Sequence, residues 1–340
     1  MVTPRPDLTR EQILAFRRRV GALDERLPAG ARSLRVAAWA GLQDSMPRAA
    51  LLSIHARVSE TRPDTWEHPS LVQVWGPRYS AYVVAKRDLA VFSLGRLPDG
   101  GARLRRAEDL AARLHAFLDG RRMRYDEAGR GVGVPPNALR YAAATGTVLI
   151  RWEGARLPVV WTAPRPQVDP IAARAELARR HLHVFGPTAP AAFARWAGIT
   201  TREAAAAYTS LADELTAVRT PIGDAWILAR DEETFGAPAE QRAVAARLLP
   251  SGDAVFLLQG RDRELLLPSP AERGELWSSR VWPGAVLVDG QVVGTWRRSH
   301  ANMMVRTWRR LSTAARDAVE AEADSLPLPG ELRTTVRWNA

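Results

Sequence analysis

Apolar residues recur at helical spacing in the first hundred residues, and short β-type runs follow them. Ile13, Phe16 and Val20 fall on one side of a first predicted helix. The predicted helices are residues 9–20, 32–42 and 47–58, with Pro47 in the first turn of the last, and the predicted strands are 71–75 and 81–84. Helices followed by a hairpin with a tight, exposed tip at 76–79 are typical of a winged helix, which we expect in residues 1–104.

The same order of patterns returns in residues 105–165. A helical pattern precedes a short helix that starts at Pro135-Pro136, and two β-type runs flank a turn at 153–155. The predicted elements are helices 107–119 and 135–143 and strands 148–152 and 157–161. We expect a second winged helix here. The proline-rich stretch 163–170 predicts a linker behind it.

A helix-turn-helix pattern with a hairpin behind it occupies residues 187–229, within a third predicted unit, 166–235. Thr188 is placed to cap a helix that has Pro190 in its first turn, and Gly198 suits the left-handed stop at its end. Thr200 and Glu203 have capping-box spacing and predict a second helix. On this helix we expect Tyr208, Leu211 and Leu215 to share one face. Strands are expected at 215–219 and 225–229 around a turn-forming loop at 220–224.

The pattern changes in the C-terminal region, residues 236–340. An apolar β-like run at 248–258 precedes two strands, 285–288 and 291–296, that flank a hairpin turn of the Asp289-Gly290 type. Residues 302–308 predict another strand, and 312–323 a helix capped by Ser312. The expected fold class is therefore mainly α with small β-hairpins (α+β): three tandem winged helix-turn-helix domains and a small C-terminal α/β region.

Charge is distributed unevenly along the chain, whose formal net charge is +11. Residues 1–170 hold 27 Lys and Arg against 17 Asp and Glu, whereas residues 171–340 hold 21 against 20. A polyanion, with double-stranded DNA first, is the simplest partner for such a basic half. A solvated arginine-rich surface is the alternative, because the chain has a single lysine, Lys86, and uses arginine elsewhere.

Several classes of protein are excluded or disfavoured by composition. The chain has no cysteine, which excludes disulfides, thiol nucleophiles and cysteine-ligated metal sites. His181 and His183 are the only close pair of histidines, and no run of acidic residues lies near them, so we expect no metal and no cofactor. Without a membrane-spanning run or a signal-peptide pattern, we expect a cytoplasmic protein, associated with the nucleoid when bound to DNA, and a monomer. P-loop, Rossmann and hydrolase-elbow motifs are absent.

Four stretches, in this order and spacing, resemble one protein family. They are GLQDSMP (residues 41–47), VWGPR (74–78), FGPT followed by FARWAG (185–198), and LLPSGD with RDR and VDGQVVGTW (248–296). The chain is similar to winged-helix DNA-binding proteins of the AlkZ and YcaQ type, several of which are DNA glycosylases. The resemblance implies three tandem winged helices around duplex DNA, and a catalytic Gln-x-Gln or Gln-x-Asp pair.

The positions that match the catalytic pair are Gln43 and Ser45, with Asp44 between them. A glutamine oxygen can hold the water that attacks the sugar, which suffices when the leaving purine is already cationic, as after alkylation at N7. Serine departs from the family's pattern but could donate one hydrogen bond or hold the water, and Asp44 could supply charge, although it would point away from Gln43 on a helix or a strand. The expected catalytic residues are therefore Gln43, which orients the water, and Ser45 or Asp44, which assists it. Polar turn chemistry before Pro47 is the alternative interpretation of this triplet.

Two functions follow as expectations. The first is a monofunctional DNA glycosylase for alkylated or bulky-adduct purines, because a lyase step needs an amine and only Lys86 and the N-terminus supply one. The second is a catalytically silent DNA-binding protein, a regulator or damage-recognition factor; an interaction scaffold is weaker. We expect DNA contacts from Arg48, Arg57, Trp75, Arg78, Tyr79, Arg140, Arg151, Arg195 and Arg202. Asp253, Arg261 and Arg263 are expected to form structural ion pairs.

Overall fold

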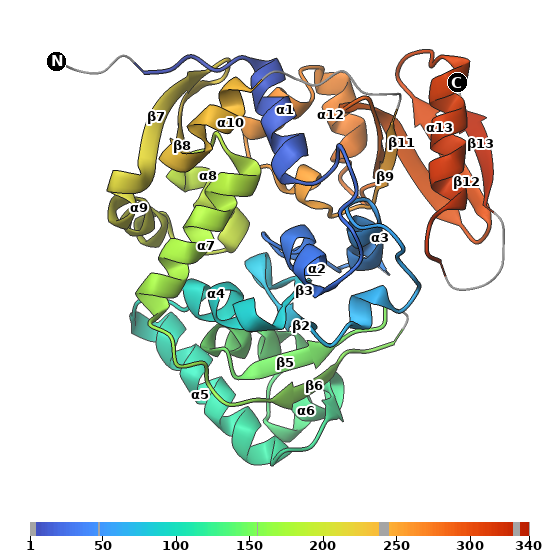
Figure 1. Ribbon diagram of the computed structural model, residues 1–340. Coiled ribbons are helices and arrows are strands. Elements are labelled where there is room, and N and C mark those ends of the chain that lie inside the picture. Colours follow the sequence, from blue (N-terminus) through green and yellow to red (C-terminus); the bar gives the residue numbers. More distant parts are fainter. Residues whose placement is uncertain (1–4, 47, 155, 238–244, 329–333, 340) are drawn as a thin grey trace.

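The structure is a computed structural model of the chain (Figure 1). It describes residues 5–46, 48–154, 156–237, 245–328 and 334–339. Pro47 and Ala155, which the sequence places in a helical turn and a hairpin turn, lie outside these ranges. Among the described residues the strands form three sheets, of six, five and two strands. No described helix is both long enough and apolar enough to cross a lipid bilayer.

The six-stranded sheet joins the first two predicted units, and its strand order is β1-β3-β2-β5-β6-β4. Its strands are β1 (Leu42–Gln43), β2 (Leu71–Trp75), β3 (Ala81–Ala85), β4 (Met123–Arg124), β5 (Val148–Arg151) and β6 (Val159–Thr162). The hairpins β2–β3 and β5–β6 confirm the sequence prediction. They also pair with each other, where Gln73 lies opposite Ile150. Residues 9–86 and 105–163 therefore share one sheet.

Helices precede each of these hairpins. They are α2 (Ala31–Ala37), α3 (Ala49–His55), α5 (Gly101–Leu118), α6 (Tyr125–Gly131) and the 3₁₀ helix η5 (Pro136–Thr145), with α4 (Leu89–Ser93) after β3. The helix predicted at 107–119 begins six residues earlier, and the one predicted at 135–143 is a 3₁₀ helix. α5, α6 and the β5–β6 hairpin bury a common core and form the lower part of Figure 1.

The N-terminal helix α1 (Arg10–Val20) does not pack as expected. Its Thr9–Gln12 capping box and its buried Ile13 and Phe16 confirm the amphipathic helix. However, its apolar face meets residues far along the chain, and the ring of Phe16 stacks on Phe235 with 3.7 Å between centroids. Ile13 and Phe16 therefore pack with residues 218–265, whereas Leu14 of the same helix belongs to the large cluster that also contains Val74 and Tyr82 of the first hairpin.

The third unit contains a helix that the sequence pattern did not predict, α7 (Pro170–Phe185), followed by α8 (Pro190–Ala197), α9 (Thr201–Ser210) and the hairpin β7 (Leu215–Thr220)–β8 (Gly223–Leu228). The stop at Gly198 (φ 74°) and the Thr200–Glu203 capping box are confirmed. Two details are wrong. Thr188 does not cap α8, because its hydroxyl donates to Asp262 instead. Leu215 is not on the helix, because it opens β7.

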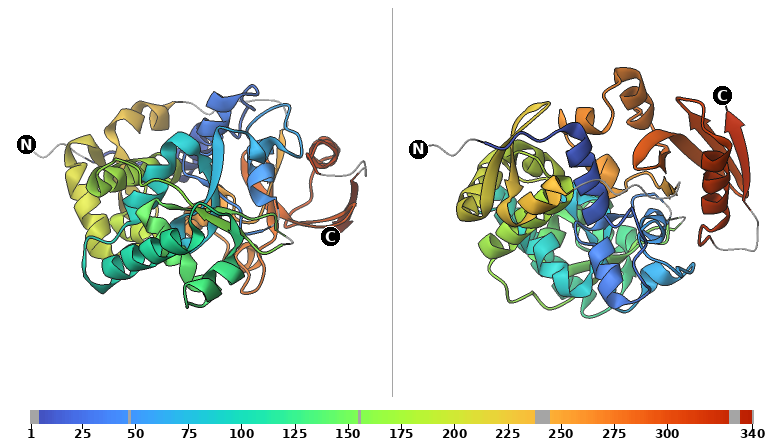
Figure 2. Two further views of the ribbon diagram at one scale, coloured as in Figure 1. Left: turned by 90° about the horizontal axis from the view of Figure 1, so that it is seen from below. Right: turned by 45° about the horizontal axis from the view of Figure 1, so that its top comes forward.

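The C-terminal region forms the five-stranded sheet β13-β12-β11-β10-β9, which is covered by α13 (Thr313–Asp324). Its strands are β9 (Ala246–Leu249), β10 (Gly284–Val288), β11 (Gln291–Ser299), β12 (Asn302–Thr307) and β13 (Thr335–Asn339). The turn at Asp289 and Gly290 is confirmed, with positive φ at both residues. The apolar run 248–258 is only partly a strand, because residues 254–257 form a 3₁₀ helix. Figure 2 shows α13 and β13 at the opposite side of the molecule from β7–β8.

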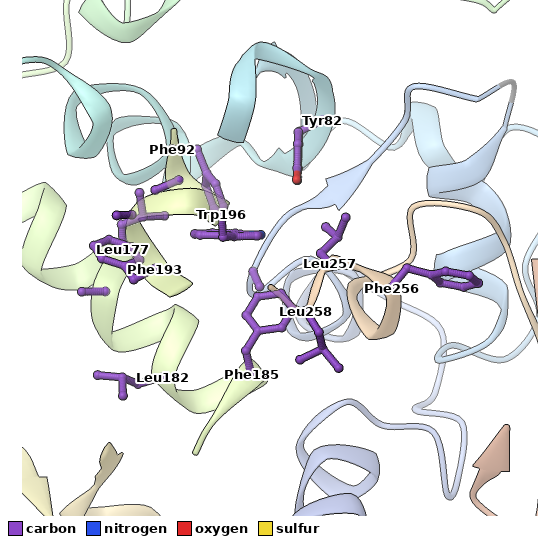
Figure 3. Close-up of a cluster of buried hydrophobic side chains, with 14 of the residues drawn as sticks. Tyr82, Phe92, Leu177, Leu182, Phe185, Phe193, Trp196, Phe256, Leu257 and Leu258 are labelled. Atoms are coloured by element: carbon purple, nitrogen blue, oxygen red, sulfur yellow. The ribbon is translucent and has the colours of Figure 1, made fainter. Parts of the chain in front are cut away.

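The largest buried cluster lies between these parts. Figure 3 shows Phe193 and Trp196 of α8 on one side and Phe256, Leu257 and Leu258 on the other, with Tyr82 of β3 close by. All these side chains are buried. A close-packed core resists local rearrangement. The cluster therefore fixes the position of β3, and of its neighbouring strand β1, relative to the C-terminal half.

Candidate active site

Gln43 is held by contacts from three parts of the chain. It ends β1 and pairs with Tyr82 of β3. Its side-chain oxygen accepts a hydrogen bond from Nη2 of Arg78 at 2.8 Å and lies 3.4 Å from the Tyr82 hydroxyl. Gly252 lies beside the Gln43 side chain, since a Cβ added there would be in van der Waals contact with the Gln43 amide nitrogen at 3.4 Å, and its φ of 86° favours glycine. Gln43 is half-buried.

The Tyr82 hydroxyl is a donor that does not ionise near neutrality. Its ring is fully buried, and burial raises the pKa of Tyr82 to about 12. A phenol that stays protonated can donate to the Gln43 oxygen at every ordinary pH. The Gln43 oxygen therefore has two neighbouring donors, Arg78 and Tyr82, and its amide is fixed in direction.

The tip between β2 and β3 carries a strained backbone. Arg78 and Tyr79 both have positive φ, 53° and 57°, which is uncommon for residues other than glycine. The backbone of Arg78 lies against Gly198, where an added Cβ would come within 3.2 Å of the Arg78 Cα. The Tyr79 ring meets Tyr141 edge-on, and Arg96 lies over its face. Strain of this kind persists when the surroundings fix it, and it is common at functional sites.

Asp44 faces away from Gln43 and does not reach solvent. It is 3 % exposed, and its two carboxylate oxygens accept from the Ala50 N–H (3.0 Å) and the Gln73 amide (2.6 Å). Burial raises the pKa of the Asp44 carboxyl to about 6, against the opposing effect of these two donors. Both carboxylate oxygens are engaged inside the protein, so the structure does not bring Asp44 together with Gln43, and its part in catalysis stays a prediction.

Gln73 connects Asp44 to the second hairpin, and sequence reasoning missed it. Its amide donates to Asp44 and to the Trp152 carbonyl (3.2 Å), and its oxygen accepts the Trp152 N–H (2.7 Å). Gln73 is 5 % exposed. The only sequence signal was a polar residue in the apolar run 71–75. Buried amides are retained where every polar atom is satisfied, and here the amide fixes the backbone of Trp152 beside residues 43–45.

Ser45 is half-buried and lines a hollow of about 530 Å³ together with Trp75, Tyr79 and Arg140. These four sequence-predicted residues are therefore brought together, although they come from both hairpin units. Trp75 is only 8 % exposed and packs into the core around α5, so it can present no more than one edge of its ring.

Arg57 does not lie on the surface. Its side chain is 4 % exposed, and its guanidinium donates to both carboxylate oxygens of Asp253, at 2.7 and 2.9 Å. The Ser53 hydroxyl donates to the same carboxylate. Its donors are used within the protein, so the structure does not place Arg57 on a surface where the expected DNA contact could form. The ion pair expected at Asp253 is confirmed, but its partner is Arg57 and not Arg261 or Arg263.

The other sequence-predicted arginines are distributed over several surfaces. Arg48 and Arg151 both lie over the ring of Trp66, at 4.7 and 4.6 Å from its centroid, and Arg151 also pairs with Glu67 at 2.8 Å. Arg195 on α8 and Arg202 on α9 are exposed. Phosphate contacts from these four arginines stay a prediction.

The two neighbouring histidines do not share a site. His181 is buried against Phe185, Phe193 and Trp196, and burial lowers its pKa to about 3. His183 is bonded through Nδ1 to Asp231 at 2.8 Å. Within the described ranges, no three histidine, aspartate or glutamate side chains are grouped so that they could hold a metal ion.

The pKa of Asp44 predicts how stability depends on pH. Unfolded Asp44 titrates near 3.8 and folded Asp44 near 6, so the folded state binds the proton more tightly between these values. The contribution of Asp44 to the free energy of unfolding therefore falls as pH rises through this window and is constant above it. Asp44→Asn lacks this titration. Relative to the wild type, its free energy of unfolding should rise by up to about 3 kcal/mol between pH 4 and 7.

Urea unfolding at pH 4, 5, 6 and 7 measures this difference, with the surface variant Asp213→Asn as the control, which should stay parallel to the wild type. A difference between Asp44→Asn and the wild type that stays constant over this range would contradict a buried, titrating Asp44.

The family model described as "DNA glycosylase AlkZ-like" matches residues 36–327 of the chain. Among solved structures, the DNA glycosylase AlkZ of Streptomyces sahachiroi superposes with a TM-score of 0.78 at 20 % sequence identity, covering 98 % of this chain and 100 % of that one. This likeness shows the fold. No curated protein matches the chain in sequence.

Proposed function

The chain belongs to the AlkZ-like DNA glycosylase family, and on this premise we propose that it is a monofunctional glycosylase that removes alkylated or bulky-adduct purines from double-stranded DNA. Members of a DNA glycosylase family act in DNA repair and bind DNA. We propose in addition that this chain acts as a monomer, without a metal or another cofactor, and hydrolyses the N-glycosidic bond with water as the nucleophile.

The observation that carries this proposal is the position of Gln43. Gln43 is half-buried at the end of β1, two residues before Ser45, and its amide oxygen accepts a hydrogen bond from Arg78. Departure of an N7-alkylated purine needs little acid catalysis, because the base leaves as a neutral molecule from a cationic state. What remains for the protein is to hold a water at the anomeric carbon and to tolerate an oxocarbenium-like sugar, which a neutral amide oxygen can do.

Arg78 can also bind a DNA phosphate at this site. A DNA phosphate is a stronger acceptor for a guanidinium than an amide oxygen is, because the hydrogen bond joins two ions. When Arg78 turns to the phosphate beside the lesion, the Gln43 oxygen is released and can accept from the attacking water. Ser45, which faces the hollow, can donate one hydrogen bond to the same nucleotide.

The order of elements supports three tandem winged helices as the DNA-binding body. A helix, a second and a third helix, and a hairpin occur in sequence as α2, α3, η1 (Thr65–Glu67) and β2–β3, as α5, α6, η5 and β5–β6, and as α7, α8, α9 and β7–β8. Exposed Arg195 and Arg202 lie on the second and third helices of the last set. Helices in these positions are those that approach the DNA backbone or groove.

A catalytically silent DNA-binding protein is the second candidate function, and one observation favours it. Ser45 has neither an amide nor a carboxylate, and Asp44, the only acid beside it in sequence, is turned into the protein. Such a protein would bind modified duplexes selectively and release no base. The two candidates therefore differ in base release and agree in binding.

Borohydride trapping tests the monofunctional mechanism. Lys86 lies four residues beyond Tyr82, so the strand geometry places it about 13 Å along β3 from the partner of Gln43. On a duplex with one N7-alkylated guanine, we expect release of the base, an intact strand at the abasic site, and no covalent adduct after reduction. Lys86→Arg should behave like the wild type. A trapped complex that Lys86→Arg abolishes would contradict hydrolysis by water alone.

A further inference from the structure

The hollow beside Ser45 differs in its lining from a second hollow of similar volume on the described surface. It has a volume of about 530 Å³, and it lies between the β1–β3 edge and the β5–β6 hairpin. Four aromatic residues line it: Trp75, Tyr79, Tyr125 and Trp152. The second hollow, of about 470 Å³, has His68 but no tryptophan, tyrosine or phenylalanine among the residues that line it, and three carboxylates, Glu60, Asp64 and Glu67.

The chemistry of the lining selects a planar aromatic ligand that carries negative charge nearby. No carboxylate is found among the residues that line the hollow, whereas Arg140 and Arg156 do line it and Asn137 offers an amide. Arg140 donates to the Asn137 carbonyl at 2.9 Å, and Arg156 lies 3.9 Å from Glu153. Aromatic walls with a cationic rim are the usual means of holding an unstacked base or fused ring beside its phosphates.

The wall of the hollow is connected to residues 43–45, the candidate reaction centre, through the backbone and through hydrogen bonds. Ser45 forms part of its wall, and Trp152 is fixed through its backbone to Gln73, whose amide also holds Asp44. A ring seated here would therefore lie against the residue that follows Asp44, on the side opposite the buried carboxylate. The volume falls within the range of about 300–1,000 Å³ that is typical of small-molecule sites.

We propose that this hollow receives a planar aromatic group of the damaged nucleotide, stacked on Trp152 and Tyr79, and so selects the lesion. This inference rests on the proposed function for the identity of its ligand. Two sources share this chemistry: the modified base itself, turned out of the duplex, and a fused aromatic adduct attached to it.

Equilibrium binding tests the hollow without any catalytic step. The probes are three duplexes that differ at one position: guanine, N7-methylguanine, and guanine bearing a fused-ring aromatic group at N7, each on a 2′-fluorinated sugar that resists cleavage. We expect the wild type to prefer a modified duplex. Trp152→Ala should weaken that binding about 5- to 100-fold and leave binding to the guanine duplex unchanged, because the stacking contact is lost. Trp152→Phe should retain most of the preference.

A second pair of variants distinguishes a loss of binding in the hollow from a general effect of an added charge on folding. Leu157 lines the hollow and is 43 % exposed, and Val168 is 45 % exposed outside it. Leu157→Asp should lower the preference for the modified duplex, whereas Val168→Asp, which adds the same charge elsewhere, should not.

Each outcome decides the proposal. Equal losses on both modified duplexes assign the base to the hollow, and a loss confined to the fused-ring duplex assigns the adduct; both support the proposal. A wild type that binds the three duplexes equally, or variants that weaken all three alike or none, would overturn it. Base release by the wild type is measured separately on duplexes with ordinary sugars. Base release without selective binding by the hollow would overturn this proposal and leave the proposed glycosylase function intact. Selective binding without base release would support the hollow as a binding site in a catalytically silent protein.

Discussion

Replacing Arg57 by methionine should lower the free energy of unfolding by about 3–5 kcal/mol. Asp253 is fully buried, and Arg57 donates to both of its carboxylate oxygens. Methionine fills a similar volume but leaves the carboxylate with the Ser53 hydroxyl as its side-chain donor. An uncompensated buried charge is costly. The expected loss of stability therefore comes mainly from the Asp253 carboxylate that remains buried without Arg57, and less from the lost attraction between the two charges. Urea unfolding at pH 7 measures it.

Two controls separate this effect from a general loss of charge. The double variant Arg57→Met with Asp253→Leu removes both charges and should recover most of the stability. Arg5→Met breaks an exposed pair with Asp224, whose side chain is 63 % exposed, and should change stability by less than about 1 kcal/mol. If Arg57→Met were as mild as Arg5→Met, Arg57 would be free of the protein interior and available for DNA after all.

Gln43→Ala should reduce the single-turnover rate of base excision by about 10²- to 10⁴-fold, the range lost when a group that positions or accepts a proton in the transition state is removed. Alanine cannot hold the water, and Arg78 and Tyr82 lose the acceptor that they share. Affinity for the same duplex should change little, because Gln43 is neutral and half-buried. Single-turnover excision with protein in excess, beside a binding titration, measures both quantities.

The matched control is Gln167→Ala, which removes the same side chain from the exposed linker, where its amide donates to the Arg165 carbonyl at 3.3 Å. Excision by this variant should equal that of the wild type. Unchanged excision by Gln43→Ala would assign the reaction to other residues, whereas a parallel loss of affinity would make Gln43 a binding residue.

Local chemistry in the sequence predicted local structure well. The Thr200–Glu203 capping box and the stop at Gly198 were predictable because each depends on residues within a few positions of one another. Thr188 has the same cap chemistry, yet its hydroxyl found Asp262, 74 residues away. A short-range signal cannot exclude a better partner that folding brings close.

Contacts between distant residues were not predictable from one sequence. The pairing of Gln73 with Ile150 joins two hairpins that each read as complete, and the pattern of apolar residues in either hairpin is satisfied without the other. The α1 helix was predicted from its periodicity, but periodicity says only that a face is buried, not that Phe235 covers it.

The candidate site was predicted in part for the same reason. The alternation of side chains along a strand correctly separated Gln43 from Asp44, which lies on the opposite, buried side. The chemistry of arginine, by contrast, is the same on a surface and in a core. Arg57 and Arg195 could not be distinguished until the structure placed one against Asp253 and the other on the exposed side of α8.

The central claim is that the chain cleaves an N-glycosidic bond, and base release by the wild type tests it most directly. Two duplexes with the same sequence, one holding a single N7-methylguanine and one guanine, are incubated with excess protein, and the free base is quantified by mass spectrometry against the rate without protein. We expect release of the alkylated base alone, at least about 100-fold above the spontaneous rate. Release at the spontaneous rate from a duplex that the protein demonstrably binds would contradict it.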